Sequence, residues 1–103
     1  MRRVARVDAN QQAIVLAFRQ MGCSVQSLAP IGAGCPDLVC GLHSHAGHTV
    51  NLLIEVKDGA KPPSRRRLTE EEARWHANWR GQVCIVESLE DVAQIVDWAR
   101  SHL

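Results

Sequence analysis

Two short runs of the sequence carry residue types that suit the binding of a metal ion. Asp37 follows Pro36 at the start of one apolar run. Glu55 and Lys57 flank Val56 at the end of another. Because alternate residues of a β-strand share a face, we expect Glu55 and Lys57 to project together while Val56 points into a core. Carboxylate oxygens are ligands that Mg2+ prefers in proteins.

A β-hairpin would bring the two acids together. If residues 37–42 pair antiparallel with residues 50–57, symmetrically about Ala46, Asp37 lies opposite Glu55. The sequence therefore predicts two carboxylates and one ammonium group at the same end of a small sheet.

Each residue of this set has a candidate role in the metal-assisted attack of water on a phosphate. Asp37 and Glu55 would bind the metal ion, and the backbone carbonyl of Val56 is a further candidate ligand. Lys57 would orient or deprotonate the attacking water, or neutralise charge on the phosphate. Either run alone also suits an ordinary turn or half-exposed strand. The pair favours a site, because burying these charges is costly without a cation or a partner.

These residues resemble the signature of the PD-(D/E)XK nuclease superfamily, with Asp37, Glu55 and Lys57 at its positions. A later segment is similar to the helix and strand that complete the core in the VRR-NUC and Holliday-junction-resolvase branch. The resemblance covers roughly residues 8–99 and extends to small phage or prophage proteins of this length. The later residues that carry it are Leu68, Thr69, Glu72, Trp75, His76, Trp79, Gly81, residues 83–86 and Ser88.

The resemblance implies an α/β fold in which a mixed α+β sheet forms a restriction-endonuclease-like αβββαβ core, here with an additional C-terminal helix. It implies a Mg2+- or Mn2+-dependent endonuclease acting on DNA, and a homodimer, since resolvase-like members act as two-fold dimers. A chain of 103 residues leaves no room for a second DNA-binding domain. Selection of a DNA structure, such as a junction or flap, is therefore expected. The alternative is a non-catalytic nucleic-acid-binding or regulatory protein that keeps this fold.

The chain departs from the family pattern on the first helix. Many members have an acid there, whereas residues 10–13 are neutral and Asp8 is the remaining candidate metal ligand. Glu72 and His76, on the helix after the signature, are candidate accessory residues. Glu87 stands where that branch often has an arginine.

Capping residues and glycines predict where the helices begin and end. Asp8 and Gly22 would bound a first helix over residues 9–21, with Ile14, Val15 or Leu16, Phe18 and Met21 on its apolar face. Further strands are expected over 24–28 and 82–87, and a glycine-rich bend over 31–34. Residues 60–67 are expected to form a loop, because Pro62 and Pro63 exclude helix and strand. A second helix would start in a capping box of Thr69 and Glu72 and end at Gly81, and Ser88 would cap a final helix.

Basic residues are unevenly distributed although the formal net charge is only +1. A DNA backbone would meet them, and such contacts position a substrate without reading its sequence. The alternative for the arginine-rich loop is a solvent-exposed segment that binds no partner. The candidate DNA-binding residues are Lys61, Arg65, Arg66 and Arg67 near the site, and Arg2, Arg3 and Arg6 at the start of the chain.

Length and composition predict one domain over residues 1–103, since 46% hydrophobic content supports a single modest core. The sequence has no apolar stretch of membrane-spanning length and no apolar block after the first arginines, so we expect no membrane association and a cytoplasmic location. We expect reduced, structural thiols in that compartment at Cys23, Cys35, Cys40 and Cys84.

Histidines and tryptophans offer competing interpretations. His43, His45 and His48 lie near Cys40, but their spacing matches no standard zinc module, and an exposed hairpin tip is favoured over a zinc site. The tryptophans are expected to be core or interface anchors, with base stacking as the alternative, at Trp75, Trp79 and Trp98.

Overall fold

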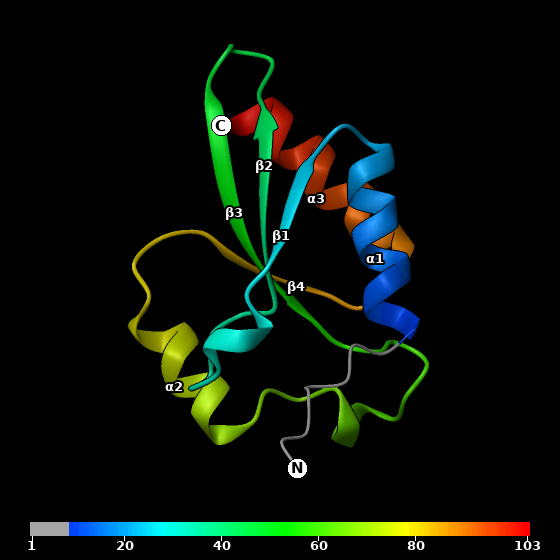
Figure 1. The fold of residues 1–103 in the computed structure, drawn as a ribbon, viewed down its shortest axis with the longest axis vertical. Helices are drawn as coiled ribbons and strands as arrows, with labels where there is room; N and C mark the ends of the chain where they lie inside the picture. Colours follow the sequence, from blue (N-terminus) through cyan, green and yellow to red (C-terminus); the bar gives the residue numbers. More distant parts are fainter. Residues whose placement is uncertain (1–8) are drawn as a thin grey trace.

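The computed structural model describes residues 9–103, so the predicted roles of Asp8, Arg2, Arg3 and Arg6 lie outside the described residues. The order of elements is α1, β1, β2, β3, α2, β4 and α3, as the sequence predicts (Figure 1). The helices are α1 (Ala9–Gln20), α2 (Glu70–Asn78) and α3 (Leu89–His102), and the strands are β1 (Ser24–Ser27), β2 (Leu38–His43), β3 (Thr49–Val56) and β4 (Val83–Val86).

The four strands form one mixed sheet in the order β1-β2-β3-β4. The first three strands are antiparallel, and β4 pairs in parallel with β3 after the crossover through α2. In the central hairpin Leu38 pairs with Ile54 and His43 with Thr49. This is the predicted register, which places the start of β2 beside the end of β3.

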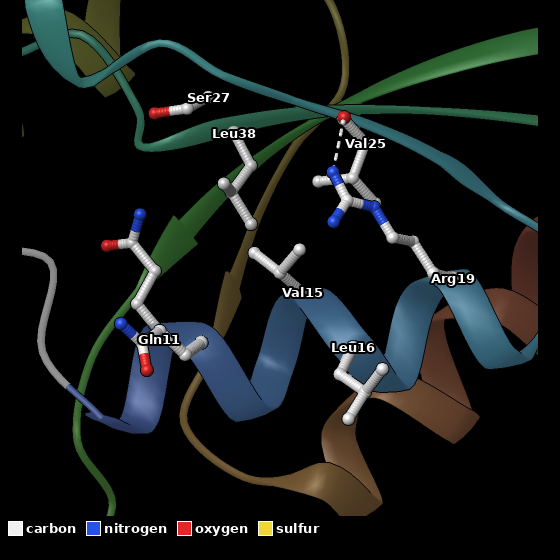
Figure 2. Close-up of a pocket in the computed structure, with 8 residues that line it drawn as sticks. Gln11, Val15, Leu16, Arg19, Val25, Ser27 and Leu38 are labelled. Atoms are coloured by element: carbon white, nitrogen blue, oxygen red, sulfur yellow. Dashed lines mark hydrogen bonds between the residues drawn. The ribbon is translucent and has the colours of Figure 1, made fainter.

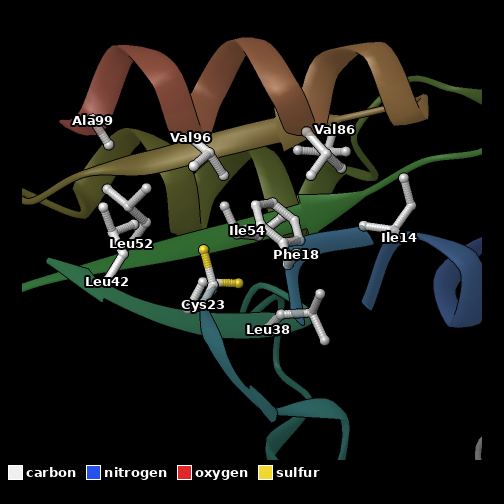
Figure 3. Close-up of a cluster of buried hydrophobic side chains, with 12 residues drawn as sticks. Ile14, Phe18, Cys23, Leu38, Leu42, Leu52, Ile54, Val86, Val96 and Ala99 are labelled. Atoms are coloured by element: carbon white, nitrogen blue, oxygen red, sulfur yellow. The ribbon is translucent and has the colours of Figure 1, made fainter. Parts of the chain in front are cut away.

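The core lies between one face of the sheet and helices α1 and α3 (Figure 3). Leu38, Cys40 and Leu42 alternate with less buried residues along β2, as expected for a strand with one face on a core. Phe18 of α1 is fully buried against them. Leu16, which the helical periodicity offers as an alternative core residue, is 56% exposed instead.

Helix ends follow the capping signals in most cases. Thr69 and Glu72 form the predicted capping box, and the Ser88 side chain accepts from the backbone N–H of Asp91. Gly22 has a φ of 87°, a left-handed conformation that suits glycine just after α1.

Two predictions of local structure are wrong, one on the end of α2 and one on the loop over 60–67. Helix α2 ends at Asn78, before Gly81, because Trp79 adopts an extended conformation with a ψ of 128°. The loop over 60–67 contains a 3-10 turn at Pro63–Arg65. Proline fits the first turn of a helix, where its missing N–H has no intrahelical partner, so Pro63 does not exclude this turn.

Helix α2 packs differently from the other two helices. The side chains of Glu55, in β3, and Lys57, just after it, point away from the core that contains Ile54, and both contact α2. Helix α2 therefore covers the face of the sheet opposite to the core. None of its residues is fully buried, whereas α3 buries Val92, Val96 and Ala99.

The glycine-rich bend touches the backbone of α2. A 3-10 turn, η1 (Ala29–Ile31), leads into Gly32, Ala33 and Gly34, which all have positive φ. A Cβ atom on Gly34 would lie 2.6 Å from the carbonyl oxygen of Glu71. This close approach sets the distance between the bend and the first turn of α2.

Three further observations concern the whole described chain. Cys23, Cys35, Cys40 and Cys84 are free thiols. The hairpin tip exposes His43, His45 and His48, as predicted, although His48 Nδ1 lies 2.6 Å from the carbonyl oxygen of Leu103. Within residues 9–103, no helix has the length and apolar character needed to cross a membrane.

We expect Gly34→Ala to be much more destabilising than Gly47→Ala. Both glycines have positive φ, of 81° and 85°, but a Cβ on Gly47 would meet no atom within 4 Å. Gly47→Ala should cost about 1 kcal/mol of conformational strain. Gly34→Ala should cost about 1–3 kcal/mol more, because the bend must separate from α2. Urea unfolding monitored by circular dichroism measures both, and equal losses would contradict the close approach.

Candidate active site

Asp37 and Glu55 meet at the end of the hairpin, as its register predicts. Asp37 immediately precedes β2, and its Oδ2 accepts a hydrogen bond of 2.8 Å from the backbone N–H of Val56. Glu55 precedes Val56 in β3 and is only 1% exposed. The site therefore contains a carboxyl group that is almost completely removed from solvent.

The environment of Glu55 strongly disfavours its ionisation. Burial, then a hydrogen bond with the side chain of Asp37, then the charges of Asp37 and Glu72 raise the pKa of Glu55 to about 9, although the charge of Lys57 opposes this. Without a cation, Glu55 therefore favours its neutral form, and its hydrogen bond with Asp37 takes the place of repulsion between two charged carboxylates.

Lys57 lies on the same face of β3, where it binds an acid of α2. Its Nζ donates to Glu72 Oε1 over 2.7 Å, and the same oxygen accepts from the backbone N–H of Thr69. Burial opposes the ionisation of Glu72, but the hydrogen bonds from Lys57 and Thr69 outweigh it and lower the pKa of Glu72. Glu72 thus holds the ammonium group beside the acid pair.

His76 also reaches the site from α2. Its Nε2 lies 3.3 Å from Glu55 Oε1, and its ring packs edge-on against Trp75. Glu72 and His76 are one helical turn apart, so both project from the face of α2 that covers the sheet. The two candidate accessory residues are therefore both in contact with signature residues.

A cleft of about 290 Å³ opens from Asp37 and Glu72 towards solvent. Gln11 from α1, Thr69, and Cys35 from the glycine-rich bend contribute to its walls. Burial, together with the nearby Glu55 and Asp37, raises the pKa of the Cys35 thiol. The cleft is thus built from α1, the bend and α2, and Asp37 is the member of the acid pair that lines it.

Sequence reasoning gave Gln11 and Cys35 no role in the site. It treated residues 10–13 as a neutral replacement for a missing acid, yet Asn10 Nδ2 donates to the carbonyl oxygen of Lys57 over 2.9 Å. This bond fixes the start of α1 at the end of β3. The signal available in the sequence was the run of three side-chain amides at the start of a helix.

The donor set suits a hard divalent cation. Asp37 and Glu55 supply carboxylate oxygens in a buried position, where a cation would replace the shared proton. Within residues 9–103, no three histidine, cysteine, aspartate or glutamate side chains are grouped to hold a metal ion. Mg2+ commonly uses one or two carboxylates and completes its coordination with water and phosphate, so the acid pair fits it.

The basic loop is only partly available for binding. Lys61, Arg65 and Arg67 are exposed. Arg66 instead donates to Glu87 Oε2 over 2.8 Å and links the loop to the end of β4. Contact of Arg66 with DNA stays a prediction, and it would compete with the ion pair that Arg66 forms with Glu87.

A separate hollow of about 290 Å³ lies between α1 and the edge strand β1 (Figure 2). Val15, Leu16 and Leu38 line it, and Arg19 donates across it to the carbonyl oxygen of Val25 over 3.4 Å. Its lining contains no acid, whereas Asp37 and Glu72 line the first cleft.

The chain matches no family model, no curated protein and no solved structure in comparisons with known proteins.

We expect the metal-free protein to lose stability as the pH rises. Between the usual 4.5 of glutamate and about 9, folded Glu55 keeps a proton that the unfolded chain releases. The free energy of unfolding should therefore fall over this range, by up to about 1.4 kcal/mol per pH unit. Urea unfolding from pH 5 to pH 9 in the presence of a chelator measures this slope.

Glu55→Gln removes the titrating group, so its stability should vary less with pH and exceed that of the wild type at pH 9. Glu90→Gln, which changes an exposed acid of α3, is the matched control and should keep the wild-type slope. An unchanged slope in Glu55→Gln would show that Glu55 ionises normally.

Proposed function

We propose that the protein is a Mg2+- or Mn2+-dependent DNA endonuclease with a restriction-endonuclease-like core. The observation that carries this proposal is the buried Glu55 carboxyl, which shares a hydrogen bond with Asp37 and lies near Lys57. Asp37 and Glu72, the partner of Lys57, line a polar cleft. Purely structural roles rarely bury an acid beside another acid, because each disfavours the ionisation of the other.

In this proposal Asp37 and Glu55 hold the metal ion, with the backbone carbonyl of Val56 as a third oxygen. The metal would supply Lewis-acid stabilisation of the phosphate and a more acidic water. The Val56 N–H fixes the Asp37 carboxylate, and His76 orients that of Glu55. These contacts hold two ligands on a rigid hairpin before substrate arrives.

Lys57 is the candidate group for the attacking water or for the charge that develops on the phosphate. Glu72 keeps it charged and fixes its position beside the acids. Because Glu72 belongs to α2 and Lys57 directly follows β3, the lysine is oriented only while the helix stays on the sheet. Glu72 is therefore a positioning residue in this proposal.

DNA is the proposed partner, bound through phosphates at Lys61, Arg65 and Arg67, and a homodimer would present two sites to a branched substrate. The alternative is a non-catalytic nucleic-acid-binding or regulatory protein. The Lys57–Glu72 ion pair favours this alternative, since an ammonium already bound to a carboxylate is less available to a substrate. Metal-dependent cleavage distinguishes the two functions.

We expect wild-type protein to cleave DNA in Mg2+ or Mn2+, and Asp37→Asn and Glu55→Gln to abolish cleavage. Both changes remove a negative ligand yet keep shape, and an asparagine oxygen can still accept from the Val56 N–H. The assay compares junction, flap, single-stranded and duplex substrates. The stabilisation of the wild type by Mg2+ in thermal unfolding provides a second readout that does not depend on turnover.

The control for this assay is Asp58→Asn, which changes an acid next to Lys57 whose Oδ1 accepts from the backbone N–H of Ala60 in a turn. It should cleave like the wild type. Wild-type turnover in Asp37→Asn or Glu55→Gln would refute the assignment, and no cleavage by the wild type on any substrate would favour the non-catalytic alternative.

The basic loop should supply affinity without chemistry. Changing Lys61, Arg65 and Arg67 to glutamine should weaken DNA binding and reduce the slope of log affinity against log salt by up to about 0.9 per lost phosphate contact. Turnover at saturating DNA should stay unchanged. Arg66→Gln is the matched control, since its partner is Glu87 and it should keep the wild-type slope. Fluorescence anisotropy over a salt series measures both, and identical slopes in the triple variant and the wild type would exclude these contacts.

A further inference from the structure

Two stacked tryptophans line a hollow beside the proposed active site. The rings of Trp75 and Trp79 lie 4.7 Å apart with an interplanar angle of 17°. Trp79 is 48% exposed, which is unusual for so large an apolar side chain. The hollow measures about 350 Å³ and is lined by Ala33, Glu71, Arg74, Trp75, Asn78 and Trp79.

This hollow adjoins the cleft that Asp37 and Glu72 line. Ala33 and Glu71 line both spaces and therefore form the wall between them. A DNA strand whose phosphate lies at Asp37 would therefore pass close to the tryptophan pair.

The lining suits a flat, polar-edged molecule. Indole rings stack on any nucleobase, because every base has an aromatic face. Glu71, Arg74 and Asn78 add acceptors and donors for the edge of a base. Arg74, the cation of the lining, is paired with Glu70 over 3.4 Å, and Glu71 adds a carboxylate to the lining. These charges favour the base over the phosphate backbone as the occupant of the hollow.

The tryptophan pair is also held in place. Helix α2 ends at Asn78, so Trp79 leaves the helix, and a Cβ on Gly81 would lie 2.9 Å from Trp79 Nε1. The glycine allows the chain to fold back along the indole. The ring is thereby fixed, which lowers the entropy lost when a base stacks on it.

On the premise of the nuclease function proposed above, we propose that this hollow holds an unpaired nucleobase of the DNA substrate, next to the scissile phosphate. The base stacks on Trp79, and Glu71 and Asn78 face its edge. Removing a base from a duplex breaks its pairing and stacking, so single strands, flaps and branch points bind better than fully paired DNA.

The test is a binding measurement in the presence of a chelator, where no cleavage occurs. The probe is an oligonucleotide carrying 2-aminopurine at an unpaired flap position, compared with a blunt duplex of equal length. In the wild type, 2-aminopurine fluorescence should be quenched at saturation by stacking. Trp79→Ala should abolish the added quenching and weaken flap binding by about 5- to 100-fold, while duplex binding changes by less than about twofold.

Trp98→Ala is the matched control. Trp98 is 42% exposed and stacks on His102 of α3, away from the proposed site, so its removal should leave flap binding and quenching unchanged. Trp79→Phe keeps an aromatic face and should recover most of the affinity. It also separates stacking from a general loss of structure in Trp79→Ala.

Several outcomes would overturn the inference: no quenching in the wild type, equal losses for flap and duplex in Trp79→Ala, or an equal effect of Trp98→Ala. The result is separable from the nuclease proposal. Selective loss of flap binding in Trp79→Ala without cleavage by the wild type would keep the base site in a non-catalytic protein. Cleavage that depends on Asp37 with unchanged flap binding in Trp79→Ala would keep the nuclease and reject the base site.

Discussion

A carboxyl group removed from solvent on one face of a small sheet is the constraint around which this structure is arranged. Glu55 has no room to be solvated, so its contacts must come from the protein. The side chain of Asp37, which precedes β2, forms a hydrogen bond with Glu55, and His76 contacts Glu55 from α2. Since no residue of α2 is fully buried, these polar contacts, the Lys57–Glu72 ion pair and the approach of the bend hold the helix in place. The contacts that position α2 are therefore the same contacts that surround the buried acid.

Much of this arrangement follows from local sequence rules. The register of the hairpin was predictable because alternation and symmetry about Ala46 allow one pairing that buries Leu38 and Ile54 together. The capping box at Thr69 and Glu72 was predictable because its two hydrogen bonds involve residues three apart. The order of elements, and with it the meeting of Asp37 and Glu55, depends on these short-range signals.

Contacts made by long side chains between distant segments were not predictable in this way. Arg66 looks like its basic neighbours in the sequence, and only the three-dimensional position of Glu87 separates it from them. Gln11 and Cys35 gain their place in the cleft from the packing of α1 and the bend, which no spacing rule encodes. The end of α2 was missed because glycine at position 81 serves the indole of Trp79 and not the helix terminus.

The location of the tryptophans also decides what intrinsic fluorescence reports. Trp75 and Trp79 lie at the end of a helix held mainly by polar contacts, and Trp98 lies on the exposed side of α3, whereas the buried aromatic residue is Phe18. Tryptophan emission therefore reports changes in polarity around α2 more than the unfolding of the hydrophobic core. A partial opening that lifts α2 from the sheet would shift the emission spectrum while the backbone signal of the strands persists. Fluorescence and circular dichroism, which report the same transition for most small proteins, would then give different unfolding curves here. The difference between the curves would measure how tightly α2 is held on the sheet.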